Sequence, residues 1–100
     1  MTGLNDELTI HRREDRLIAR VIDGEAIIVD FKTGDHFSLN QIGTLVWEMA
    51  DGQHSFQDIV ASILERYDIS ETQARADLSK LVSDMENENL VVLGEAPLSS

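Results

Sequence analysis

The spacing of the apolar residues changes near residue 40, and this change limits the chain to a fold that contains both strands and helices. Residues 17–39 hold short apolar runs separated by Gly-containing turn signals, a pattern typical of antiparallel strands joined by tight turns. After residue 40, apolar residues recur every three or four positions, which predicts helices. We therefore expect an α+β fold, in which a three-stranded antiparallel sheet is followed by three helices. The predicted strands are residues 17–22, 24–31 and 36–39.

Each predicted helix begins after a residue that can cap it. Asn40, Ser55 and Ser70 precede the helical patterns, and their side-chain oxygens can accept hydrogen bonds from the free N–H groups of the first turn. Gln73 follows Ser70 by three positions, which predicts a capping box. The first helix is expected to stop near residue 50, where a glycine follows.

The length of 100 residues is typical of one domain. We expect an N-terminal segment at 1–16, the folded domain at 17–93 and a flexible tail at 94–100. A short first strand is predicted at residues 8–10 and a last strand at residues 90–93. Three apolar residues in succession at 27–29 predict a strand that is covered on both faces.

The composition excludes several classes of protein. The chain has no cysteine, so disulfides and thiolate metal sites are excluded. No apolar run approaches the roughly 20 residues that span a bilayer, and the first residues lack a signal-peptide pattern. We therefore expect a cytoplasmic protein that does not enter the membrane.

The net charge of −11 argues against nucleic acid as a partner. Residues 1–20 hold four bases and four acids, whereas residues 21–100 hold fifteen acids and four bases, so the whole excess lies in the predicted domain. Such a surface repels phosphates. A winged-helix regulator that binds DNA is the alternative function, because three helices beside a small sheet also fit that fold. Charge disfavours it, since acidic residues dominate the predicted third helix.

No motif for catalysis, metal binding or a cofactor is present. The three histidines lie in separate segments without a metal-ligand spacing, no serine lies in a GxSxG motif, and no Gly-rich loop fits a phosphate. We expect a protein that is not an enzyme and holds no cofactor or metal. An open edge strand beside a helix can instead accept an extended peptide. The same edge permits a weak homodimer in place of a monomer, and a domain that only bridges two proteins is a further alternative.

One ordered run of residues resembles the PqqD-like family, whose pattern is roughly D-x-x-T-G-x-x-[FY]-x-L-N-x-x-G-x-x-[IV]-W-E-x-x-D-G. The resemblance covers about residues 17–93. The matching positions in the run are Asp30, Thr33, Gly34, Phe37, Leu39, Asn40, Gly43, Val46, Trp47, Glu48, Asp51 and Gly52.

The resemblance implies a winged-helix-like domain that recognises precursor peptides. Family members bind the leader of a ribosomally synthesised peptide as an added strand between their third strand and third helix, and present it to a modifying enzyme. That enzyme is a radical SAM enzyme in pyrroloquinoline quinone biosynthesis, and a leader peptidase or cyclase in lasso peptide biosynthesis. The Asp-x-x-Thr-Gly turn and the Val-Trp-Glu run of this chain are commoner in lasso-peptide and other clusters than in quinone-pathway members. The resemblance therefore leaves the pathway open.

The resemblance also places the candidate peptide-binding residues on two elements. The strand side consists of His36, Phe37, Ser38 and Leu39, and the helix side consists of Arg75, Leu78, Ser79, Val82 and Met85. Arg75 is expected to pair with an acidic leader residue. The three apolar residues on the helix side fit the core equally well, and Val29 and Phe31 are candidates for the floor of the groove.

Overall fold

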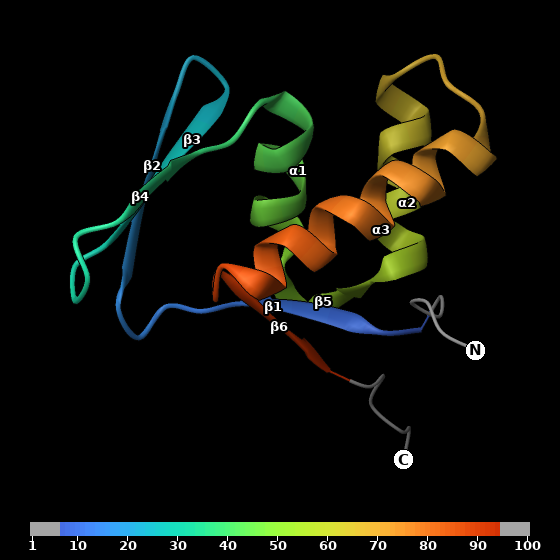
Figure 1. Cartoon of the computed structure of the whole chain (residues 1–100). Helices are drawn as coiled ribbons and strands as arrows, with labels where there is room; N and C mark the ends of the chain where they lie inside the picture. The colour runs from blue at the N-terminus through green and yellow to red at the C-terminus, as the bar shows by residue number, and fades with distance from the viewer. Residues whose placement is uncertain (1–6, 95–100) are drawn as a thin grey trace.

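The computed structural model describes residues 7–94 and confirms the α+β fold (Figure 1). In chain order the elements are β1 (Thr9–Arg12), β2 (Leu17–Ile22), β3 (Glu25–Asp30), β4 (His36–Ser38), α1 (Gln41–Met49), β5 (Asp51–Ser55), α2 (Phe56–Arg66), α3 (Glu71–Asn87) and β6 (Val91–Gly94). None of these helices is long and apolar enough to cross a membrane, within the residues described.

The strands form two three-stranded antiparallel sheets. The sheet β2-β3-β4 is the predicted meander, and it packs against α1. The second sheet, in the order β5-β1-β6, joins strands far apart in the sequence and lies below the helices in Figure 1. Its strand β5 was not predicted, because the stretch Asp51–Ser55 carries no alternation of apolar and polar residues.

The predicted turns form as their chemistry requires. Asp23 and Gly24 have φ angles of 54° and 80°, the left-handed conformations that a two-residue hairpin turn needs. At the next turn, a side-chain oxygen of Asp30 accepts hydrogen bonds from the N–H groups of Lys32 (2.9 Å) and Thr33 (3.2 Å). The Asp-x-x-Thr-Gly run therefore builds a turn and positions β4 beside β3.

Asp30 is also the buried partner of an ion pair. Its second carboxylate oxygen lies 3.0 Å from Nε of Arg16, and the residue is only 5% exposed. Burial raises the pKa of Asp30, but the two N–H groups and the charge of Arg16 together hold it below its ordinary value. The carboxylate thus stays ionised inside the sheet at neutral pH.

The three helices begin where the sequence predicts. Asn40 accepts from the N–H of Gly43 at 2.8 Å, and Ser55 forms a complete capping box with Asp58. Ser70 accepts from the N–H of Gln73, but the Gln73 amide donates to Asp77 at 2.7 Å and does not serve the predicted capping box. The helix starts are confirmed, while the partner of Gln73 differs from the prediction.

One core joins both sheets to the helices. Ile10 of β1 is 1% exposed, so the segment before residue 17 takes part in this core. Ile28 of β3 is fully buried, whereas its neighbours Ile27 and Val29 are 40% and 39% exposed. The prediction that β3 is covered on both faces is therefore wrong. The predicted tail is described only at Gly94, which ends β6, because residues 95–100 lie outside the described part.

Candidate functional site

The edge strand β4 presents free hydrogen-bonding groups. The N–H of Asp30 donates to the Asp35 carbonyl and the N–H of Leu39 donates to the Ala26 carbonyl, each at 2.8 Å. Because the direction of backbone groups alternates along an antiparallel pair, His36 and Ser38 point their N–H and C=O groups away from β3. These two residues can therefore hydrogen-bond to an added strand.

The side chains of β4 alternate between two environments. His36 and Ser38 are exposed on the outer face of the sheet, opposite Val29 and Ile27. Phe37 and Leu39 are half-buried and pack against the core. A strand added to β4 would meet exposed backbone groups and, on the inner face, the partly buried Phe37 ring.

The C-terminal half of α3 is the part of that helix nearer to the β2-β3-β4 sheet (Figure 1). Leu78, Val82 and Met85 are 1%, 0% and 2% exposed, so their side chains belong to the core. Leu81 is half-buried on one flank of this core-facing stripe. Leu81 was not among the contacts predicted from the sequence, although its position beside the stripe leaves it partly exposed.

The opposite flank of α3 is occupied by contacts with α2. The Arg75 guanidinium pairs with Glu71 at 3.0 Å, hydrogen-bonds to Gln57 of α2 and lies 6.0 Å from the centre of the Phe56 ring. Ser79 follows Arg75 by four residues and so shares its flank. Arg75 also lies in the N-terminal half of α3, whose first turns are on the far side of the molecule from β4 in Figure 1. The structure thus directs Arg75 to α2.

Two further predicted positions lie on the other face of the sheet. Val29 is 39% exposed and Phe31 is 56% exposed, and both follow the alternation of β3 away from the core. They do not form the floor of a groove that faces α3. The inner positions of β3 belong to Ala26, Ile28 and Asp30, all of them buried.

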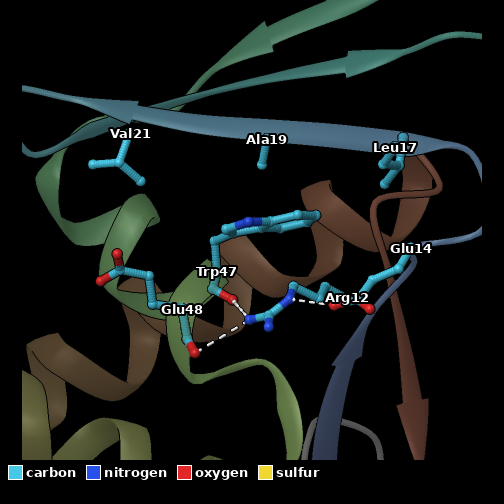
Figure 2. A pocket seen from close by; sticks show the side chains of 7 residues that line it. All are labelled: Arg12, Glu14, Leu17, Ala19, Val21, Trp47 and Glu48. Carbon is cyan, nitrogen blue, oxygen red and sulfur yellow. Dashed lines mark hydrogen bonds and ion pairs between the residues drawn. The ribbon is translucent and has the colours of Figure 1, made fainter.

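The strand β2 is a second open edge of the same sheet. The N–H of Phe31 donates to the Arg16 carbonyl at 3.1 Å. This bond determines which residues of β2 direct their backbone groups toward β3 and which direct them away. Leu17, Ala19 and Val21 consequently point their backbone groups away from β3. Below them lies a recess of about 430 Å³ (Figure 2). It is lined by Arg12, Glu14, Leu17, Ala19, Val21, Trp47 and Glu48.

Arg12 and Trp47 shape the floor of this recess. The guanidinium of Arg12 donates to the carbonyl oxygens of Trp47 (2.9 Å) and Glu48 (3.3 Å) near the end of α1 and pairs with Glu14 at 2.8 Å (Figure 2). It also lies 5.9 Å from the centre of the Trp47 ring. Sequence reasoning missed the recess, because no local pattern links two residues 35 positions apart.

The open strand edges of the β2-β3-β4 sheet suit the binding of an extended chain. Within residues 7–94, no group of three or more His, Asp or Glu side chains could hold a metal ion. On strand β5, Nδ1 of His54 lies 2.9 Å from the carboxylate of Asp51. Open strand edges can bind an extended chain through its backbone.

Comparisons with known proteins agree with this geometry. The family model for Coenzyme PQQ synthesis protein D (PqqD) matches residues 25–91. One similar solved structure is TbiB1 in complex with the TbiA(beta) leader peptide, with a TM-score of 0.73 and 22% identity, covering 80% of this chain and 93% of that one. Another is a lasso peptide synthetase B1 complexed with its leader peptide, with a TM-score of 0.70 and 21% identity, covering 86% of this chain and 98% of that one. No curated protein sequence matches. Because the family model matches 67 of the 100 residues, the chain belongs to the PqqD family.

Proposed function

We propose that this chain binds the leader of a ribosomally synthesised precursor peptide as an extra strand on β4. The observation that carries the proposal is the outward direction of the N–H and C=O groups of His36 and Ser38 at the edge of a sheet. Membership of the PqqD family and a fold shared with two proteins solved with leader peptides support it.

The proposed contacts on the strand side are His36, Phe37, Ser38 and Leu39. The first and third offer exposed side chains and free backbone groups, while Phe37 and Leu39 offer partly buried apolar surface. An extended leader would thus gain main-chain hydrogen bonds and bury apolar side chains at alternate positions.

On the helix side, burial separates the predicted residues into two groups. Leu78, Val82 and Met85 are buried in the core and cannot touch a bound peptide directly. We therefore propose that the partly buried Leu81 supplies the apolar contact between α3 and the leader. Ser79 and Arg75 remain predicted contacts only for a leader that continues to α2, since Arg75 already contacts that helix. We expect affinity in the micromolar range, or about −8 kcal/mol.

The bound leader would be delivered to a modifying enzyme, either a radical SAM enzyme or a leader peptidase or cyclase. In this proposal the chain itself is a binding module without catalytic residues. A DNA-binding regulator gains no support, because exposed acidic residues outnumber basic ones on α3.

A pair of proline variants tests the proposal on folded protein. Ser38→Pro removes an outward N–H from β4 without removing a bond to β3, and Ala19→Pro does the same on β2. We expect Ser38→Pro to weaken binding of a synthetic leader by about tenfold, because one main-chain hydrogen bond and the close approach of the strand are lost. Ala19→Pro should leave affinity unchanged. Isothermal titration calorimetry measures both.

The leader for this experiment is that of the precursor encoded beside this chain, and circular dichroism checks that each variant folds. If only Ala19→Pro loses binding, the leader binds at the β2 edge and not at β4. No binding by the folded parent chain at several hundred micromolar would overturn the proposal.

A further inference from the structure

The outer face of the β2-β3-β4 sheet is apolar and open. On this face Ile18 and Ile22 of β2 are 59% and 51% exposed, and Ile27 and Val29 of β3 are 40% and 39% exposed. Phe31, 56% exposed, extends the row beyond β3. Contiguous apolar surface of this kind marks an interface more often than scattered apolar residues do.

The strand register makes these side chains one continuous patch. Ile18 lies opposite Val29, Arg20 opposite Ile27, and Ile22 opposite Glu25. Directly opposed residues of an antiparallel pair have Cβ atoms about 5 Å apart and project on the same side. Four apolar residues therefore share this face with one cation and one anion.

Those two charges distinguish this face from the rest of the molecule. Arg20 and Glu25 cancel, although the whole chain carries a net charge of −11. Both are exposed, and neither forms an ion pair with another residue of the described range 7–94. Two copies of so acidic a protein repel one another, and they would repel least through the face whose own charges sum to zero.

The arrangement of the four central residues is complementary to itself. Arg20 and Glu25 lie on one diagonal of the rectangle that they form with Ile22 and Ile27. A two-fold axis along the other diagonal brings each Arg20 near the Glu25 of the second copy. The same axis places Ile22 over Ile22 and Ile27 over Ile27. The interface would then contain two ion pairs and a central apolar contact.

We infer that this face binds a second copy of the chain, to give a symmetric dimer in which two β2-β3-β4 sheets pack face to face. The backbone groups of the β4 edge stay free in this dimer, while the side chains of His36 and Ser38 project from the same face, opposite Val29 and Ile27. The dimer therefore goes beyond the proposed function and does not depend on it.

Sedimentation velocity over a range of concentrations tests the dimer. The parent chain should show a monomer–dimer equilibrium, and Ile27→Lys should weaken association at least tenfold by placing two ammonium groups against each other. The matched control is Val92→Lys, at an apolar residue of β6 that is 49% exposed and outside this face. It should associate as the parent does.

A charge swap tests the arrangement itself. Arg20→Glu alone and Glu25→Arg alone should each weaken association severalfold, and the double swap should restore it. A parent chain that stays monomeric at millimolar concentration would overturn the inference, as would single swaps with no effect. Dissociation caused by Ala19→Pro and not by Ile27→Lys would place the contact at the β2 edge and also overturn it. Leader affinity of folded Ile27→Lys, measured separately, shows whether the proposed function stands when the dimer does not.

Discussion

The two sheets of this chain differ in what they leave open. Of the seven large apolar residues exposed in the described part, six lie between residues 18 and 31, in or next to the β2-β3-β4 sheet, and only Val92 lies in the other sheet. The central strand β1 of the β5-β1-β6 sheet instead buries Thr9 and Ile10, at 5% and 1% exposure. Both sheets contribute to the single core, but the β2-β3-β4 sheet also leaves a face with large apolar residues exposed.

Close packing around β1 is a second difference between the sheets. The His11 ring lies against two glycines, and a Cβ atom built on Gly52 would come within 2.5 Å of that ring. By contrast, a Cβ atom on Gly24, at the hairpin of the other sheet, would meet nothing within 4 Å. Strand β5 therefore depends on tertiary contacts, whereas the β2-β3 hairpin depends on its local turn.

The largest expected difference between the sheets concerns two isoleucines. Ile10→Ala should lower the free energy of unfolding by about 2–5 kcal/mol, because it leaves a cavity in the core. Ile18→Ala, at a residue that is 59% exposed, should change it by less than about 0.5 kcal/mol. Urea unfolding followed by circular dichroism measures both. Equal losses would mean that the exposed face contributes as much to stability as the core does.

Two glycine variants sharpen the same comparison. Gly24 and Gly52 have nearly equal φ angles of 80° and 79°, so an alanine at either position carries the same backbone penalty of about 1–2 kcal/mol. At Gly52 the added methyl group would also meet the exposed ring of His11, which must move aside, so alanine costs somewhat more there. In thermal unfolding, Gly52→Ala should therefore have a lower melting temperature than Gly24→Ala. The reverse order would mean that β5 does not pack as described.

The smallest predicted effect is a pH dependence at the β3–β4 turn. Because the pKa of Asp30 is lower in the folded chain than in the unfolded chain, its contribution to stability is present above about pH 4 and is lost as the pH falls through the folded pKa. Asp30→Asn removes this contribution, so the loss of stability between pH 7 and pH 3 should be shallower than in the parent. Urea unfolding at several pH values checks the slope. An unchanged slope would assign the acid sensitivity to other carboxylates.

Local chemistry explains which parts of the fold could be predicted from the sequence. Asp23-Gly24 and the caps at Asn40 and Ser55 act within a few residues, and their elements begin where expected. The strand β5 has no local signal, because it is defined by pairing with β1 at least 40 positions away. Likewise, the apolar run at residues 27–29 indicates a strand but does not reveal that one face stays uncovered.

In the candidate site, too, local features could be predicted from the sequence and tertiary contacts could not. The strand His36–Ser38 could be predicted from the sequence, and it forms the edge strand β4, while its contact with a leader stays a prediction. The helix side could not, because the periodicity of α3 does not separate core-facing Leu78 from flanking Leu81. The direction of Arg75 depends on Gln57 and Phe56, on a different helix.

Amide hydrogen exchange with saturating leader peptide, read residue by residue by NMR, tests the central claim most directly. An added strand on β4 accepts hydrogen bonds from the N–H groups of His36 and Ser38, so the exchange of these two amides should slow strongly while those of Leu17, Ala19 and Val21 keep their rates. Protection at the three β2 amides, or bound peptide without protection at either edge, would contradict leader capture on β4.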